Sequence, residues 1–287
     1  MIRRNWQAPF LAPLIIVLLV TTVLPIGFMI MLALGEETGN LGELRFTGPQ
    51  NFGTALGSPA LWHSIGLVVA FLVGALALEL LIGVSAALVL DRLLPGNSII
   101  RVLLLWPAVL PPIAVALIFK FILQGDIGLI SYYLGLIGIE QEWLTGPTSA
   151  MAVIIGVDIW QYTPFVILLT LAALTGIPAE LREAAVVDGA RPGQVIRHII
   201  LPMISTATVA TALLRFIDAI QVFPTIYTLT RGGPGTSTQL LTFYNYQVFF
   251  GELKFGLGAA VAVIVVCFTL LCVGSLLLVQ RRTERLL

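Results

Sequence analysis

The sequence carries little charge, and its few cysteines form no recognisable site. Only 10% of the 287 residues are charged, and the 15 basic and 15 acidic residues cancel. Soluble domains carry roughly 25% charged residues. The balance also excludes the basic surface of a nucleic-acid-binding protein. Cys267 and Cys272 lie together in one apolar run without metal-ligand spacing, so we interpret them as apolar filler and predict no metal site.

Motifs for nucleotide binding and catalysis are missing as well. The sequence contains no P-loop of the form G-x-x-x-x-G-K-[ST], no H-E-x-x-H and no G-x-S-x-G. We therefore expect a protein that is not itself an enzyme and that needs no cofactor of its own. If ATP supplies its energy, another polypeptide must carry the ATPase.

Apolar residues are abundant, at 58% of the chain. A hydrocarbon core about 30 Å thick requires about 20 apolar residues in a helix. Six stretches are long enough, namely 10–34, 62–90, 98–123, 148–174, 203–226 and 256–279. The first is longer than a signal-peptide core and no clear A-x-A site follows it, so we expect a retained span. The predicted fold class is all-α, a polytopic membrane protein with one transmembrane domain over residues 1–287.

Orientation follows from the distribution of Lys and Arg, which are enriched on the cytoplasmic side of membrane proteins. If both termini are cytoplasmic, that side holds Arg3, Arg4, Arg92, Arg101, Arg182, Arg191, Arg197, Arg281, Arg282 and Arg285. The outer side then holds Arg45, Lys120, Arg231 and Lys254. This bias predicts cytoplasmic termini, in agreement with an even number of spans.

The segment 178–202, which joins the fourth and fifth spans on the cytoplasmic side, is far more polar than its surroundings. Pro178, soon after Gly176, signals the start of a new element. Pro192 suits the first turn of a helix, and Gly189 suits a left-handed C-cap. The sequence therefore predicts a short helix, an elbow and a second helical start, with Pro202 at the entry to the fifth span.

The short helix has a distinctive surface. Glu180 and Glu183 lie near its N-terminus, where the helix dipole favours acids. Residues 184–187 are Ala-Ala-Val-Val, which predicts a compact surface that another protein could approach closely. The alternative is an amphipathic helix that rests on lipid headgroups.

The stretch "EAAVVDGARPGQVIRHIILP" resembles the EAA loop of binding-protein-dependent ABC importers. That pattern is E-A-A, a short spacer, D-G-A and an apolar run that ends I-x-L-P. The matching positions are Glu183, Ala184, Ala185, Asp188, Gly189, Ala190, Ile199, Leu201 and Pro202. The resemblance implies that the first six of these couple the chain to a cytoplasmic ATPase, with Glu183 paired to a basic group and Gly189 permitting the elbow.

Residues 215–250 are similar to the corresponding region of maltose-type carbohydrate permeases. The matches are Phe216, Asp218, Leu229, Thr230, Gly232, Gly233, Pro234, Thr238, Tyr244 or Tyr246, and Phe249 or Phe250. "RFTGPQNFGTAL", before the second span, is also similar to a family element. One departure is the aliphatic pair Val195 and Ile196, where the family often has an aromatic residue. This departure bears on packing at the coupling joint.

Several polar side chains fall inside the predicted spans, where an ionisable group costs about 2.5–3.5 kcal/mol and usually faces protein or water. They are Glu79, Asp158, Gln161, Arg215, Asp218 and Gln221. Asp158 and the Arg215–Asp218 pair come to a similar depth near the midplane, where transporter sites often lie. Glu79 is expected nearer the cytoplasmic half of its span and receives less weight.

The spacing of these residues suggests a substrate pathway. Asp158 and Gln161 are three apart and share a helical face that Phe165 continues, and Asp218 and Gln221 have the same spacing. Acids and amides beside an aromatic ring suit a sugar. Two structural alternatives stay open: an Arg215–Asp218 ion pair that neutralises itself, and helix–helix hydrogen bonds from Asp158 and Gln161.

The third predicted span contains Pro107, Pro111 and Pro112. Proline inside a helix removes hydrogen bonds and kinks or breaks the helix. We therefore expect a bent span. The bend could line a cavity or a gate, or it could be a fixed feature of the fold.

Together these features indicate a type I ABC importer permease-like subunit. Its expected cargo is a sugar (an oligosaccharide or disaccharide) or a related polyol. The resemblance implies a second homologous permease, two ATPase subunits that bind ATP and Mg, an extracytoplasmic substrate-binding protein, and a bacterial or archaeal plasma membrane. The alternatives are the same machinery with another cargo such as glycerol phosphate, thiamine or a metal, an ion-coupled secondary transporter, or a membrane scaffold.

Overall fold

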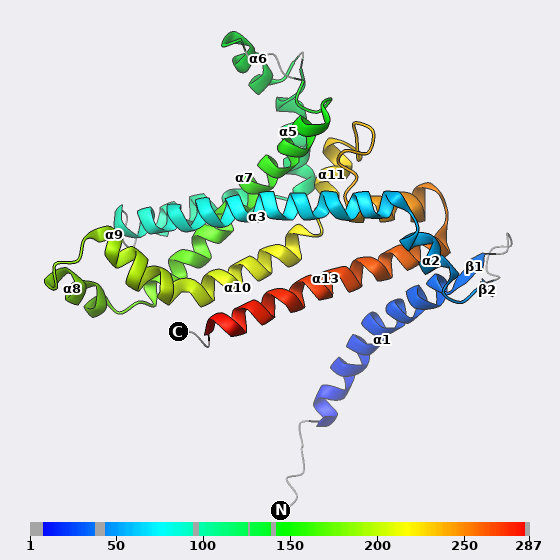
Figure 1. The fold of residues 1–287 in the computed structure, drawn as a ribbon, viewed down its shortest axis with the longest axis horizontal. Coiled ribbons are helices and arrows are strands. Elements are labelled where there is room, and N and C mark those ends of the chain that lie inside the picture. The colour runs from blue at the N-terminus through cyan, green and yellow to red at the C-terminus, as the bar shows by residue number, and fades with distance from the viewer. Residues whose placement is uncertain (1–7, 38–43, 94–97, 126, 139–141, 285–287) are drawn as a thin grey trace, which may run out of the picture. The chain divides into compact units, whose positions relative to one another are not determined.

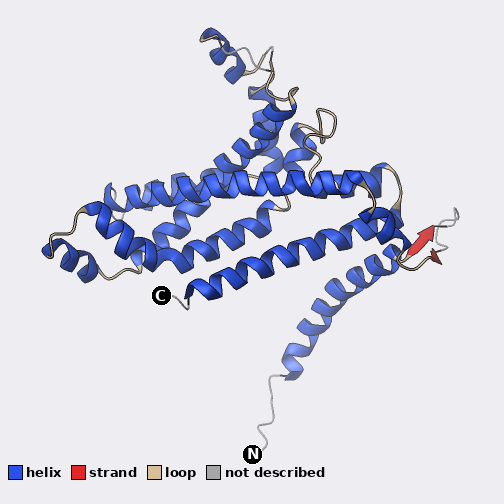
Figure 2. Ribbon diagram, in the orientation of Figure 1, coloured by secondary structure: helices blue, strands red, loops and turns tan. Residues whose placement is uncertain are grey.

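The computed structural model describes residues 8–37, 44–93, 98–125, 127–138 and 142–284. Helices dominate these residues, with one short strand pair (Figures 1 and 2). In chain order the elements are α1 (Ala8–Ala33), β1 (Gly35–Glu37), β2 (Leu44–Phe46), α2 (Gln50–Leu56), α3 (Pro59–Leu93), α4 (Ser98–Val109), α5 (Pro112–Ile122), α6 (Leu129–Leu136), α7 (Pro147–Thr175), α8 (Ala179–Val187), α9 (Pro192–Val195), the π-helical turn η1 (Ile196–Ile200), α10 (Leu201–Ala219), α11 (Phe223–Leu229), α12 (Leu241–Tyr246), the π-helical turn η2 (Gln247–Gly251) and α13 (Phe255–Glu284). The predicted all-α class is confirmed.

Five helices in the described part of the chain are long and apolar enough to cross a membrane. They are Leu11–Ala33, Pro59–Arg92, Pro147–Thr175, Pro192–Ala219 and Phe255–Leu278. The sixth predicted span, 98–123, is divided into α4 and α5, which pass the same test together and meet at an angle of 98°. Counting this bent pair as one span gives the six that the sequence predicts.

The break in the third span has its origin in two consecutive prolines. Pro111 is extended (φ −58°, ψ 133°) because a residue before proline avoids the helical region. Pro112 then begins α5 at a first-turn position, where its missing N–H costs nothing. Pro107 is accommodated inside α4. The predicted bend is therefore located at Leu110–Pro111.

The helix that contains the start of the fifth predicted span has other limits than that span. It begins at Pro192 and continues through η1 into α10, so Pro202 lies inside it. The π-helical turn just before Pro202 changes the hydrogen-bond register and accommodates its missing N–H donor. At the other end the helix stops at Ala219, and residues 223–229 form the separate helix α11.

The chain divides into two compact units, and the predicted single domain stays a prediction. Unit 1 takes its described residues from 1–63 and 244–268. Its core joins the end of α1 to the start of α13 through Leu32, Ala33, Ala259 and Ala260. Asn51 of α2 donates from Nδ2 to the carbonyls of Ala33 (3.0 Å) and Gly35 (2.8 Å), which satisfies acceptors at the end of α1.

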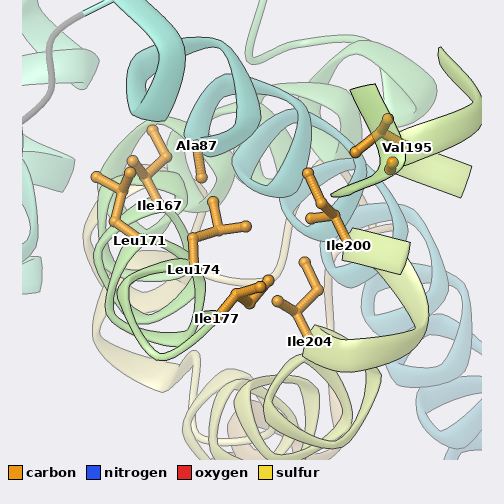
Figure 3. Close-up of a cluster of buried hydrophobic side chains, with 9 residues drawn as sticks. Ala87, Ile167, Leu171, Leu174, Ile177, Val195, Ile200 and Ile204 are labelled. Atoms are coloured by element: carbon orange, nitrogen blue, oxygen red, sulfur yellow. The ribbon is translucent and has the colours of Figure 1, made fainter. Parts of the chain in front are cut away.

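Unit 2 takes its described residues from 64–243 and 269–284 and holds the predicted site residues. A buried apolar cluster joins α3 to α7, α8, η1 and α10. Figure 3 shows its side chains converging; they are Ala87, Ile167, Leu171, Leu174, Ile177, Ala185, Val195, Ile200 and Ile204.

Helices α3 and α7 of unit 2 approach closely at Gly83. A Cβ atom there would lie 2.5 Å from Cγ1 and 2.7 Å from Cβ of Val166. Gly83→Ala is therefore expected to lower the thermal stability of the purified protein, because overpacking typically costs about 1–3 kcal/mol. Gly66→Ala, on the same helix with no atom within 4 Å, is the matched control. That control should be neutral or stabilising, since alanine favours the helix by about 1 kcal/mol. Equal melting temperatures for the two variants would contradict the close contact.

Candidate functional site

The segment 178–202 folds as the sequence predicts. Helix α8 ends at Val187, and Gly189 adopts a left-handed φ of +77°. The N–H groups of Gly189 and Ala190 then donate to the carbonyls of Val186 (3.0 Å) and Ala185 (2.9 Å), a C-terminal cap that glycine favours. Arg191 caps the next helix, with its backbone N–H donating to Oε1 of Gln194 at 2.7 Å. The result is a helix, a tight elbow and a second helix that runs on into α10.

The exposed face of α8 is partly charged and partly apolar. Glu183, Ala184 and Asp188 are exposed, and the side chains of Val186 and Val187 are 66% and 86% exposed. Gly189 is also exposed, and Ala190 is half-buried. Helix α8 therefore exposes apolar side chains, including that of Leu181, beside its acidic ones.

One prediction about this face is wrong. Ala185 does not belong to the exposed small-residue surface, because it is 9% exposed and packs into the apolar cluster of unit 2. Of the other predicted coupling residues, Asp188, Gly189 and Ala190 line an open hollow of about 340 Å³ at the elbow, and Glu183 and Ala184 lie outside it. Its lining is Asp188, Gly189, Ala190, Gln194, Val195, His198 and Ile199.

A second group of predicted residues meets around Arg215 of α10, inside unit 2. Arg215 binds Glu79 of α3 through two bonds, Nε to Oε2 at 2.8 Å and Nη2 to Oε1 at 3.0 Å. The same Nη2 atom donates to Oδ2 of Asp158 on α7 at 2.9 Å. Nη1 donates to Oδ2 of Asp218, and the ring of Tyr162 lies 3.9 Å from the guanidinium carbon. We call these five residues the Arg215 cluster.

The members of the Arg215 cluster differ in exposure. The side chains of Arg215, Glu79 and Asp158 are 1%, 0% and 5% exposed, whereas that of Asp218 is 57% exposed. Three carboxyl groups thus surround one guanidinium, and one of them reaches open space. A buried ion needs partners, and Arg215 finds them on α3, on α7 and on its own helix α10. Asp218 is the one carboxyl group of the cluster that another molecule can reach.

Glu79 contributes more to the Arg215 cluster than its position in the sequence predicts. It lies near the middle of the 35-residue α3 and provides the two-pronged contact with Arg215. The signal that could have found it is an acidic residue inside an apolar span, which requires a buried partner. Of the polar residues predicted inside the spans, only Arg215 carries a positive charge that could pair with Glu79.

The two predicted glutamines occupy different environments. Gln161 is 1% exposed and donates from Nε2 to the carbonyl of Leu110 at 2.9 Å. This bond satisfies an acceptor at the break between α4 and α5, which favours the structural alternative for Gln161. Gln221 lies in the turn after α10, so the prediction that it shares a helical face with Asp218 is wrong. Phe165 is half-buried on α7.

The fold defines a class of protein, a helical membrane protein in which a helix, a tight elbow and a second helix join two of the long apolar helices. Residues 79–285 match the family model described as the binding-protein-dependent transport system inner membrane component. The chain belongs to this family. It is therefore a membrane-embedded permease subunit of an ABC importer, a transport component rather than an enzyme.

Relatives and solved structures agree with this family. The chain is 35% identical over 256 residues, 88% of this chain and 85% of the relative, to a "Trehalose/maltose transport system permease protein MalF" of Thermococcus litoralis. It is 31% identical to a "Sulfoquinovosyl glycerol transport system permease protein SmoG" of Agrobacterium fabrum, covering 96% and 89% of the two chains. The fold matches a chain of a bacterial alginate ABC transporter in complex with alginate pentasaccharide-bound periplasmic protein. That match has a TM-score of 0.86 and 22% identity and covers 98% of this chain and 96% of the other.

Proposed function

We propose that this chain forms half of the translocation pathway of an ATP-driven importer for a disaccharide, an oligosaccharide or a related polyol. The observation that carries the proposal is the coupling segment, an exposed helix bearing Val186 and Val187 and ending at the left-handed Gly189. The names of its relatives, which concern trehalose, maltose and sulfoquinovosyl glycerol, support a carbohydrate cargo.

The partners follow from the family. A second homologous permease completes the pathway, two ATPase subunits bind ATP and Mg, and an extracytoplasmic binding protein delivers the cargo. The complex lies in the plasma membrane of a bacterium or archaeon, with both termini of this chain in the cytoplasm and lipid around its apolar helices. ATP binding closes the ATPases, the coupling segment moves, and the pathway alternates its access.

The candidate cargo contacts are the exposed Asp218 and Gln221, together with the half-buried Phe165. Carboxylate and amide groups bind hydroxyls, and an aromatic face suits the apolar side of a sugar ring. Asp158 and Gln161 are buried and contribute to the pathway indirectly. Asp158 binds Arg215, and Gln161 binds the backbone at the break in the third span. A phosphorylated cargo fits less well, because the guanidinium of Arg215 is already enclosed by three carboxyl groups.

Co-purification from the native membrane tests the proposal. The tagged wild-type chain should bring down an ATPase, a second permease and a sugar-binding protein, identified by mass spectrometry. Glu183→Ala and Gly189→Asp should lose the ATPase or its stimulation, since the first removes a charge at the coupling surface and the second strains a left-handed position. Glu180→Ala, an exposed acid in the first turn of α8, is the matched control and should behave as wild type.

A different result would redirect the assignment. If the wild-type chain is isolated alone and transports without ATP, the importer proposal is wrong. The Arg215 cluster would then be tested as the proton or sodium site of a secondary transporter.

A further inference from the structure

The coupling segment is attached to the cytoplasmic end of α3 as well as to the helices that flank it in sequence. Nη1 of Arg182, on α8, lies 2.7 Å from Oδ2 of Asp91, near the end of α3. Nη2 of Arg182 also donates to the carbonyl of Leu174 on α7 at 3.2 Å. The next residue of α3, Arg92, donates to the carbonyl of Pro192 at 3.4 Å, at the start of α9. Both halves of the coupling segment are therefore bound to α3.

Apolar packing reinforces these polar contacts. Ala87, one turn before Asp91 on α3, is fully buried in the cluster that also contains Ala185 of α8 and Val195 of α9. Figure 3 shows Ala87 pointing toward the same centre as Leu174 and Ile200, and Figure 1 places α8 and α9 beside this end of α3. Close-packed clusters transmit displacement because they resist compression. Helix α8 is thus packed against α3.

Helix α3 leads from the coupling segment to the Arg215 cluster. Asp91 and Glu79 are 12 residues apart on this one unbroken helix, or about 18 Å at the helical rise. A second path runs from Pro192 through η1 and α10 to Arg215 on one continuous helix. The two-pronged contact between Glu79 and Arg215 joins the two paths at their far ends.

We propose that α3 is a second transmitting arm of the importer and that the Asp91–Arg182 ion pair is its joint with the coupling helix. The proposal rests on the proposed function, since an ATPase must move α8. With the joint intact, α3 and α10 move together and carry the Glu79–Arg215 contact as one body. Without it, movement of α8 reaches α10 through the elbow while α3 lags behind. Asp91 and Arg182 are positioning residues for coupling, and neither has to touch cargo or nucleotide.

The test uses the complete importer in proteoliposomes, with Asp91→Ala, Arg182→Ala and the double variant. Transport and ATP hydrolysis are measured together. Each single variant should hydrolyse ATP at a rate close to wild type, because a partly exposed ion pair, with the side chains of Arg182 and Asp91 30% and 18% exposed, contributes little to stability. Cargo moved per ATP should fall about threefold to tenfold, which lies within the range of effects along coupling networks. The double variant should be no worse than either single variant, since all three break one contact.

Two further variants act as controls. Arg182→Lys keeps the charge and should retain most of the wild-type ratio. Lys254→Ala removes the exposed Glu252–Lys254 ion pair, of the same 2.7 Å length, in unit 1 and should leave the ratio unchanged. Spin labels at the exposed Glu180 of α8 and the exposed Val89 of α3 add a direct readout. The distribution of distances between the two labels should stay narrow with and without ATP in wild type and should broaden in Arg182→Ala.

The outcomes separate the two proposals. If wild type transports with ATP and the variants keep the wild-type ratio, the joint is wrong and the proposed function stands. The joint is also wrong if Arg182→Ala loses the bound ATPase, because Arg182 would then be a docking residue. If wild type shows no ATP-dependent transport, the proposed function fails and the joint fails with it.

Discussion

Arg215→Leu is expected to abolish accumulation of the folded protein. The substitution leaves Glu79 and Asp158 buried without a cation. Removing one partner of a buried ion pair typically costs about 3–5 kcal/mol, a large part of the roughly 5–15 kcal/mol that stabilises a typical protein. Size-exclusion chromatography of a fluorescent fusion in detergent measures the fraction of protein that is monodisperse. The temperature at which this fraction falls gives the thermal stability.

Companion variants show whether the loss comes from uncompensated charge. Arg215→Lys keeps the cation without its two-pronged geometry and should recover part of the folded fraction. Combining Arg215→Leu with Glu79→Gln and Asp158→Asn removes the buried charges together and should recover more. Arg45→Leu, at an exposed strand position, is the control for losing an arginine. A wild-type melting curve for Arg215→Leu would show that the Arg215 cluster does not stabilise the protein.

Val187→Asp, with or without Val186→Asp, is expected to weaken ATPase binding at least about thirtyfold while leaving the fold intact. Both valines are largely exposed, so the fold has little packing to lose. A charge placed in the buried centre of an interface costs at least about 2 kcal/mol, or about thirtyfold in affinity. Pull-down of the ATPase subunit at increasing concentration, followed by an ATP-driven transport assay, measures the effect.

Val187→Thr provides the matched control for this prediction. It keeps the branched shape of valine and adds one hydroxyl, so its affinity should lie much closer to wild type than that of Val187→Asp. Unchanged melting temperatures would confirm that folding is unaffected. If Val187→Asp binds the ATPase as tightly as wild type, the exposed valines lie outside the interface.

The sequence predicts the coupling segment well because the signals that shape it are local. Pro178, Gly189 and Pro192 each act on neighbouring backbone only, and all three occupy the helical positions expected from them. The inward position of Ala185 could not be predicted in this way. It depends on apolar residues of α3, α7 and α10 that lie far away in sequence.

The Arg215 cluster shows the same limit at longer range. The distances of Asp158 and Arg215 from the ends of their spans predict a similar depth for both residues. Their side chains are in contact. Depth alone does not give the rotation of a helix about its axis, so the role of Glu79 was underestimated. The end of α10 at Ala219 was also missed, because the apolar run continues beyond it and hides the turn that separates Gln221 from the helix.

The contact between Glu79 and Arg215 also has a consequence for biogenesis. The two residues are 136 positions apart, so the ribosome completes α3 long before Arg215 is synthesised. A lone carboxylate in hydrocarbon is unfavourable by about 2.5–3.5 kcal/mol on insertion scales. The nascent α3 therefore enters the membrane without its partner, and the insertion machinery has to shelter it until α10 arrives. This part of the helical bundle is assembled late, when Arg215, in the last third of the chain, binds carboxylates inserted before it.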